Sequence, residues 1–247
     1  MDPGDIAMSE RVKSPTSVII PAYNEEPTIR QVISGLLDER RYPEIIVVDD
    51  SSSDKTGFLA EELRVKVIRH ETRRGYGAAL KTGIKYARGD IIIILDADDT
   101  YSPGDIKRLL KSFEAGGYDM VVGVRDLGHF PFYQKFAKGF VTSVMAAIFR
   151  QKVPDINSGL RVMKREVVEK YLSVLSDGFS FTASSTLAML LGRHKIGYVE
   201  VGYSGRAGRS NVEIAAYTIN FIRSYWRVIY RLKIAAKLSR GRGGMRV

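Results

Sequence analysis

The chain alternates short apolar runs with longer stretches in which apolar residues recur every three or four positions. Runs rich in Val and Ile favour β-strands, and the three-to-four spacing favours helices with one buried face. The pattern predicts strands at 17–21, 44–48, 65–69, 91–95 and 120–124. It predicts a first helix that starts within residues 24–27 and ends at 37, and further helices at 56–63, 78–87 and 103–114. Such alternation predicts an α/β fold with a mostly parallel sheet flanked by helices.

The second half of the chain has a less regular order. Residues 133–150 have the spacing of an amphipathic helix, 155–163 read as a loop that enters a strand, 179–191 as a packed helix and 198–203 as a last strand. Residues 214–238 are a long helical candidate. We therefore expect a disordered lead at 1–15, one globular domain at 16–212, and a basic amphipathic helix and tail at 213–247.

The apolar run at 91–95 leads directly into three acids, Asp96, Asp98 and Asp99. A strand without polar alternation is buried on both faces, and ligands of open α/β sheets bind at the carboxyl ends of the strands. We expect Asp96 and Asp98 to lie on the same side of an extended backbone. Their oxygens would suit a hard cation such as Mg²⁺ or Mn²⁺ together with a substrate phosphate. The alternative is an acidic turn that caps the helix after Ser102, a role that suits Asp99.

Composition narrows the classes of site and partner. The 247 residues contain no cysteine and three scattered histidines, which argues against disulfides, thiolate chemistry, zinc ligation by cysteine and a histidine metal site. No apolar run reaches the length of a membrane span. The net charge is +10, and residues 214–247 carry eight Lys and Arg without an acid. Nucleic acid, an anionic membrane and phosphorylated substrates are candidate partners, but no nucleic-acid-binding motif supports the first.

Three short motifs follow three of the predicted strands: Pro21-Ala22-Tyr23-Asn24-Glu25, Val47-Val48-Asp49-Asp50-Ser51-Ser52 and Asp96-Ala97-Asp98. In this order and spacing they resemble a family 2 glycosyltransferase with the Rossmann-like GT-A fold, over roughly residues 16–210. Arg125 and the segments 158–161 (SGLR) and 206–210 (RAGRS) further resemble the dolichol-phosphate mannose synthase branch. The resemblance implies inverting transfer of a hexose from a nucleoside diphosphate sugar, GDP-mannose or a UDP-sugar, to a polyprenyl or dolichyl phosphate.

The resemblance also implies roles for individual residues. The residues that would bind the nucleotide-sugar donor are Pro21, Tyr23, Glu25, Val48, Asp50, Asp96, Ala97 and Asp98. The resemblance assigns the Mg²⁺ or Mn²⁺ cofactor to Asp96 and Asp98, with Thr100 as a weaker ligand where the branch often has Gln. It assigns catalytic roles to Asp98, Arg125 and Arg206, with the two arginines as phosphate ligands. The loop after Arg206 departs from the branch, because it has Ser210-Asn211 instead of Ser-Lys and is one residue shorter.

The chemistry of the acceptor points the same way. A hydroxyl acceptor needs a general base, whereas a phosphate is already ionised at neutral pH and needs cations. Many enzymes of this family supply a carboxylate base, but the corresponding residues 180–185 contain no acid. Basic residues that could meet a phosphate are Arg125, Lys135, Lys138, Arg206 and Arg209, although Lys135 and Lys138 also fit solvated surface charges. A polysaccharide or other hydroxyl acceptor is the alternative.

The C-terminal segment combines apolar anchors, Trp226, several tyrosines and only positive charge. This composition favours a helix that lies on an anionic membrane, and the alternative is a helix packed on its own domain or on a second subunit. We therefore expect a cytoplasmic enzyme bound peripherally to the cytoplasmic face of a membrane.

Overall fold

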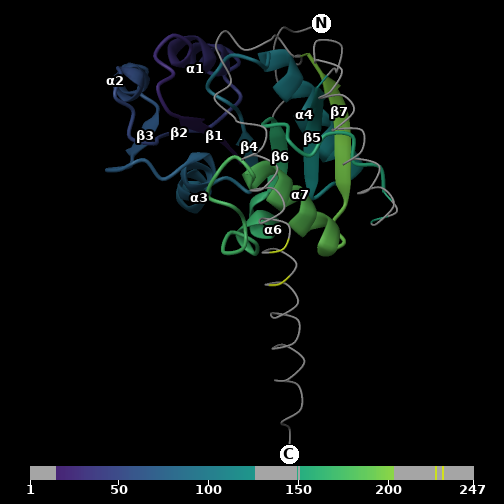
Figure 1. Cartoon of the computed structure of the whole chain (residues 1–247). Helices are drawn as coiled ribbons and strands as arrows, with labels where there is room; N and C mark the ends of the chain where they lie inside the picture. Colours follow the sequence, from purple (N-terminus) through teal and green to yellow (C-terminus); the bar gives the residue numbers. More distant parts are fainter. Residues whose placement is uncertain (1–14, 126–148, 150, 203–225, 227–229, 231–247) are drawn as a thin grey trace, which may run out of the picture.

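The computed structural model of the chain describes residues 15–125, 149, 151–202, 226 and 230. Seven strands form one sheet in the order β3-β2-β1-β4-β6-β5-β7 (Figure 1). The strands are β1 Thr16–Ala22, β2 Glu44–Asp49, β3 Lys66–Arg69, β4 Ile91–Ile94, β5 Met120–Arg125, β6 Arg161–Lys164 and β7 Ile196–Val201. The helices in the described part are α1 Ile29–Asp38, α2 Thr56–Glu62, α3 Tyr76–Tyr86, α4 Pro103–Gly116, α6 Arg165–Glu169 and α7 Phe181–Leu191.

The sheet is mostly parallel, with β6 as the exception. β1 pairs in parallel with β2 and β4, β2 with β3, and β5 with β7, whereas β6 is antiparallel to both β4 and β5. The carboxyl ends of the parallel strands therefore meet at one edge of the sheet. Because β6 runs the other way, its first residue, Arg161, lies at that edge, paired with Ile94 and Val122. The loop before β6 is thereby brought beside the end of β4.

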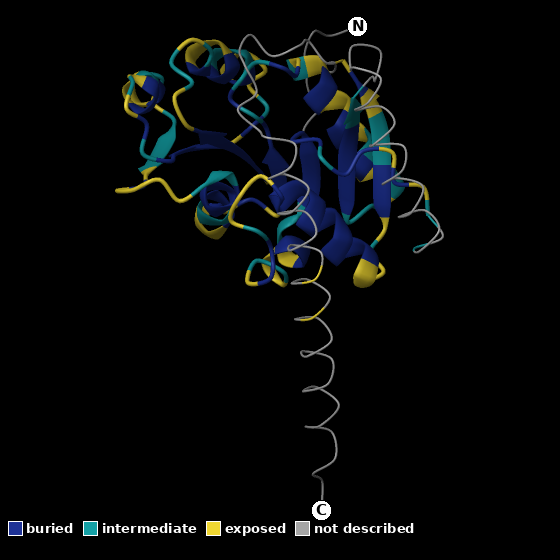
Figure 2. Cartoon of the chain, viewed as in Figure 1, coloured by how far each residue is buried: buried dark blue, intermediate teal, exposed yellow. Residues whose placement is uncertain are grey.

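Helices cover both faces of the sheet. α1, α2 and α4 pack on one face, and α3, α6 and α7 pack on the other (Figure 1). The five inner strands are buried along most of their length, whereas the edge strands β3 and β7 are partly exposed. The exposed residues lie mainly on the outer sides of the helices and in the loops (Figure 2).

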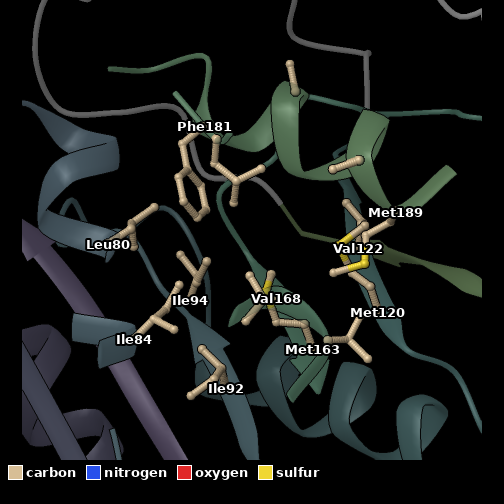
Figure 3. Packing of buried hydrophobic residues seen from close by; sticks show 14 of the residues in the cluster. Leu80, Ile84, Ile92, Ile94, Met120, Val122, Met163, Val168, Phe181 and Met189 are labelled. Atoms are coloured by element: carbon tan, nitrogen blue, oxygen red, sulfur yellow. The ribbon is translucent and has the colours of Figure 1, made fainter. Parts of the chain in front are cut away.

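The isoleucines of β4 show why this strand is central. Ile91 and Ile93 pack with α1 and α4, whereas Ile92 and Ile94 pack with α3 and α7 (Figure 3). Each has 6% or less of its surface exposed. Full burial of such a side chain contributes about 1.5–3 kcal/mol relative to exposure, so an uninterrupted apolar run is what a strand between two helical layers requires.

The predicted strands and helices of the first 125 residues are confirmed, with shifts of a few residues at their ends. The last strand begins at Ile196, two residues earlier than predicted, because it pairs with β5 from Met120 onward. It ends where the backbone N–H of Gly202 donates to Asp105 of α4 at 3.2 Å. The short helix α6 was not predicted, because five residues are too few to show a periodic pattern.

Several predictions fall outside the described residues. These are the lead at 1–14, almost all of the amphipathic helix at 133–150, and the C-terminal helix apart from two residues. Trp226 and Tyr230 are described, and both are helical and exposed. Within the described part of the chain, no helix combines the length and the apolarity that crossing a bilayer requires.

Candidate active site

The end of β1 is tied to the end of β2 by side-chain hydrogen bonds. The backbone N–H of Asn24 donates to Ser52 Oγ at 3.0 Å, and that of Glu25 donates to Thr56 Oγ1 at 2.8 Å. Asn24 adopts a positive φ of 55°, which the short polar side chain of asparagine tolerates. The predicted helix start at 24–27 is therefore wrong: this segment forms a turn that docks on the β2 loop, and α1 begins only at Ile29.

The candidate nucleotide-base residues of β1 and β2 lie next to one another. Pro21 and Val48 are partners in the sheet register and are buried, so they form the floor of this region. Tyr23 stands beyond the strand end with 36% of its surface exposed. The guanidinium carbon of Arg73 lies 3.9 Å from the Tyr23 ring centroid, a cation–π distance. An aromatic ring paired with a planar cation gives this corner a flat surface on which a base could stack.

Asp50 is buried and organises the loop between β3 and α3. Its Oδ1 accepts hydrogen bonds from His70 Nδ1 at 2.7 Å and from the backbone N–H of Arg74 at 2.8 Å, and its Oδ2 accepts from the backbone N–H of Gly75 at 2.7 Å. The other ring nitrogen of His70 lies 2.9 Å from Thr82 Oγ1. Burial disfavours the charged form, but these hydrogen bonds outweigh it and hold the pKa of Asp50 below its ordinary value of 3.8.

Asp96 is fixed on both sides of its carboxylate. Its Oδ1 accepts a hydrogen bond of 2.7 Å from the Tyr76 hydroxyl. Its Oδ2 lies against Gly159, where a Cβ would overlap the carboxylate. Burial, followed by the Asp96 charge, raises the pKa of Tyr76 well above its ordinary value of 10. The next residue, Ala97, is buried and its carbonyl accepts from Thr28 Oγ1 at 2.7 Å, which holds this turn against α1.

The expectation that Asp96 and Asp98 share one side of an extended backbone is wrong. β4 ends at Ile94, and Ala97 and Asp98 lie in a turn. Asp98 Oδ1 accepts from the hydroxyl of Thr100 at 2.7 Å and from its backbone N–H at 3.3 Å. Thr100, 3% exposed, therefore orients Asp98 in this structure, and its own role as a metal ligand stays a prediction.

Asp99 does not cap the following helix. Its backbone has a positive φ of 56°, and its Oδ2 accepts from Gln31 Nε2 of α1 at 2.7 Å. The cap of α4 is made instead by Ser102 and Asp105, which form a reciprocal capping box, with Ser102 Oγ accepting from the Asp105 backbone N–H at 3.2 Å.

The residues after β4 have the chemistry that a divalent cation requires. Asp96 and Asp98 offer carboxylate oxygens, the donors that Mg²⁺ and Mn²⁺ prefer. Gly159 leaves room for the Asp96 carboxylate, because any side chain there would fill its place. No group of three or more potential acidic or histidine ligands gathers within the described residues. Two carboxylates suit a cation whose remaining ligands come from water and from a substrate diphosphate.

Arg125 at the end of β5 is paired with a carboxylate that the sequence analysis did not single out. Its Nε and Nη2 lie 2.9 and 3.2 Å from Oδ2 and Oδ1 of Asp155, which is completely buried. This pair holds the guanidinium of Arg125 at the end of β5, and 18% of the Arg125 side chain remains exposed. Asp155 also accepts from the backbone N–H of Asn157 at 3.0 Å, so it fixes the loop before β6.

Arg161 also belongs to this region and, unlike Arg125, had no role predicted from the sequence. It is fully buried. Its hydrogen-bond acceptors within 3.0 Å are the carbonyls of Ile156 and Ser158 and the hydroxyls of Ser185 and Thr186. Burial lowers the pKa of Arg161 to about 10, so it stays charged at neutral pH. Arg161 thus joins the loop before β6 to α7, and its place in the motif at 158–161 was the signal available in the sequence.

The remaining predicted residues lie outside the described part of the chain. These are Arg206, Lys135, Lys138 and Arg209, and their proximity to Asp96 and Asp98 stays a prediction. The structure does bring together Tyr23, Asp50, Asp96, Asp98 and Arg125 at one edge of the sheet, since each follows or ends a strand whose carboxyl end lies there.

This arrangement can be compared with known proteins. The sequence model of Glycosyl transferase family 2 matches residues 17–172, which contain every candidate site residue except Arg206 and Arg209. The chain belongs to glycosyl transferase family 2. The glycosyltransferase activity expected from the three strand-end motifs is thereby supported.

Curated relatives of this glycosyltransferase include enzymes of the expected branch. Dolichol-phosphate mannosyltransferase of Pyrococcus furiosus is 36% identical over 169 residues, which cover 62% of this chain and 47% of that enzyme. Polyprenol monophosphomannose synthase of Mycolicibacterium smegmatis is 27% identical over 261 residues, which cover 99% of this chain and 95% of that enzyme. The resemblance to the dolichol-phosphate mannose synthase branch is confirmed.

A solved structure agrees with the fold. Glucosyl-3-phosphoglycerate synthase from Mycobacterium tuberculosis, in complex with Mn²⁺, UDP-glucose and phosphoglyceric acid, superposes with a TM-score of 0.72 at 25% identity. The superposition covers 87% of this chain and 80% of that one. The GT-A fold is confirmed, and the Mn²⁺ in that complex supports a divalent cation in proteins of this fold.

Proposed function

We propose that this glycosyltransferase transfers a hexose, with inversion, from a nucleoside diphosphate sugar to a polyprenyl or dolichyl phosphate at a membrane surface. GDP-mannose and UDP-sugars are the candidate donors. The observation that carries the proposal is the chemistry of the first turns of α7, which begin near the candidate metal and diphosphate site and carry no carboxylate.

The position of α7 relative to Asp96 follows from two contacts. The Tyr76 hydroxyl binds Asp96, and the Tyr76 ring stacks on Phe179, with ring centroids 5.6 Å apart. Phe179 lies two residues before α7, so this helix begins near the candidate metal and diphosphate site. An acceptor bound over Asp96 would therefore lie near the start of α7.

The start of α7 offers no group that could accept a proton from an acceptor hydroxyl. Its polar residues are hydroxyl-bearing, and those of Ser184, Ser185 and Thr186 already donate to backbone carbonyls within the helix. Asp155, the buried carboxylate nearby in the fold, is held by Arg125 through both oxygens. A phosphate acceptor does not need a base, because it is already ionised at neutral pH.

On the donor side, the described residues can bind and orient a nucleoside diphosphate. Tyr23 and Arg73 offer a stacking surface for the base, and Asp50 fixes the loop that carries Arg73. Asp96 and Asp98 would hold the Mg²⁺ or Mn²⁺, and the cation would neutralise charge that develops on the leaving diphosphate. Arg125, which Asp155 holds through Nε and Nη2, adds a positive charge that would attract phosphate oxygens, and Arg206 is the predicted second arginine.

The membrane part of the proposal rests on the acceptor and on the C-terminal segment. A polyprenyl phosphate presents its head group at a bilayer surface, so the enzyme must bind there. Residues 214–247 carry only positive charges together with apolar and aromatic residues. Each Lys or Arg near an anionic surface contributes about 1 kcal/mol to binding. We place the enzyme on the cytoplasmic face, where nucleotide sugars and anionic lipids meet.

The test is to follow release of nucleoside diphosphate from GDP-mannose and from UDP-hexoses in the presence of Mn²⁺ or Mg²⁺. A short polyprenyl phosphate is the acceptor, and the matching polyprenol without phosphate is the control. We expect release with the phosphate and none above background with the alcohol. Release with the alcohol or with an oligosaccharide, and not with the phosphate, would support the alternative of a hydroxyl acceptor.

A further inference from the structure

Tyr76, the first residue of α3, is placed to control the geometry of Asp96. It follows Gly75, whose φ of 101° turns the chain so that the side chain of the next residue points toward the end of β4. The Tyr76 hydroxyl donates to Asp96 Oδ1 at 2.7 Å. A hydrogen bond from a neutral phenol to a carboxylate is charge-assisted and stronger than one between neutral groups.

The second oxygen of Asp96 leaves the carboxylate little freedom to turn. Oδ2 and the carboxyl carbon lie against Gly159, where an added Cβ would stand only 2.5 Å from the carboxyl carbon. One oxygen is thus held by a donor and the other is packed against the backbone of the loop before β6. Loss of the Tyr76 hydroxyl would remove a directional contact that holds Oδ1 of Asp96.

Tyr76 is itself held by the segment 175–179, which leads into α7. Its ring stacks on Phe179 with 19° between the ring planes. The backbone N–H of Ala78 donates to the Asp177 carbonyl at 2.9 Å, and Lys81 Nζ lies 2.7 Å from Asp177 Oδ1. The turn packs so closely that a Cβ on Gly77 would lie 2.8 Å from the Asp177 carbonyl carbon. These contacts therefore fix the position of the Tyr76 ring.

We propose that Tyr76 is a positioning residue that fixes Asp96 for the divalent cation and the donor diphosphate. The proposal rests on the donor half of the proposed function, which is the binding of a nucleoside diphosphate sugar together with a divalent cation. It also gives segment 175–179 a role, since this segment holds Tyr76 and continues into the helix on the acceptor side. A carboxylate that is oriented by an outer hydrogen bond binds its cation more tightly, because it does not have to be ordered during binding.

The inference predicts a selective loss. Tyr76→Phe keeps the ring and its stack on Phe179 but removes the hydroxyl. Removal of such an outer-shell partner costs about 10–100-fold in metal affinity. We expect the affinity for Mn²⁺ plus nucleoside diphosphate to fall by about 10-fold or more. The affinity for the nucleotide without metal should not change, because the base site lies on β1 and β2.

The experiment is calorimetric titration of the full-length protein with GDP and with UDP, with and without Mn²⁺. The control is Tyr171→Phe, which removes a tyrosine hydroxyl hydrogen-bonded to His194 Nε2 at 3.0 Å, away from the site. Tyr171→Phe should retain the affinity gained from Mn²⁺. Wild-type Mn²⁺ dependence in Tyr76→Phe would overturn the inference, and so would an equal loss of affinity with and without metal.

A double-mutant cycle separates positioning from general destabilisation. In an Asp96→Asn background, Tyr76→Phe should cause no further loss of Mn²⁺-dependent binding, because the carboxylate that it orients is gone. A further loss of 10-fold would overturn the inference. If the wild-type protein binds neither nucleotide, the donor half of the proposed function is wrong and the inference falls with it. If it binds but does not glycosylate polyprenyl phosphate, only the acceptor half is wrong.

Discussion

Gly159→Ala tests how closely the site depends on the loop before β6. The added Cβ would lie 2.5 Å from the carboxyl carbon of Asp96 and 2.6 Å from its Oδ1. Carbon atoms in contact lie about 3.5 Å apart or more, so the carboxylate must shift by about 1 Å. Gly159 does not have a positive φ, so an alanine backbone fits there without strain. The expected damage is therefore local to Asp96.

A shift of about 1 Å at a catalytic group can lower the rate by about 100-fold. We expect kcat/KM for metal-dependent release of nucleoside diphosphate to fall by about that factor, whereas the thermal unfolding midpoint should change little because Asp96 is at the end of its strand. Gly104→Ala is the matched control, because a Cβ there meets nothing nearer than Ser102 Oγ at 3.7 Å. Activity of Gly159→Ala within a few-fold of the wild-type value would refute the placement of Asp96 in the site.

Four further predictions follow from the same arrangement. Asp98→Asn should lower activity by orders of magnitude while the fold survives, and a chelator should do the same reversibly; full turnover in excess chelator would reject the metal role. Arg206→Ala should weaken use of the lipid phosphate by about 1–3 kcal/mol in kcat/KM, with only partial rescue by Arg206→Lys; unchanged acceptor kinetics would make it a surface charge. Because the folded pKa of Asp50 is lowered, its stabilisation is present above pH 3.8 and is lost as the pH falls toward the folded pKa, so urea unfolding of Asp50→Asn and wild type should differ at pH 7 and converge in acid. Deletion of 214–247 should reduce co-sedimentation with anionic liposomes, most clearly at low salt, and leave nucleotide binding intact.

The fold was predictable because strands between two helical layers and the helices that cover them have different hydrophobic patterns in the sequence. Ile91–Ile94 lies between two helical layers and therefore has no polar alternation, and each preceding strand is followed by a helical stretch. The antiparallel direction of β6 could not be predicted from a local pattern. Four residues of strand look alike in either direction, and the direction is set by long-range pairing with Ile94 and Val122.

The site was predictable where motifs follow strands, and less so where it is built by contacts across the chain. Asp96 and Asp98 could be found because they follow β4 directly. The contacts of Tyr76 with Asp96 and of Arg125 with Asp155 join residues 20 and 30 positions apart, and nothing in local spacing reveals them. The turn at Ala97 and Asp98 was also missed, because a strand signal does not show the residue at which the strand ends.

The most direct test of the proposed transfer is to follow the sugar itself. The full-length enzyme is incubated with a radiolabelled nucleotide sugar, polyprenyl phosphate in anionic vesicles and Mn²⁺, and the label is partitioned between aqueous and organic phases. The proposed function predicts label in the organic phase that depends on the lipid phosphate, disappears with chelator and returns when Mn²⁺ is restored. Label that stays in the aqueous phase, in a saccharide product formed without the lipid, would contradict it.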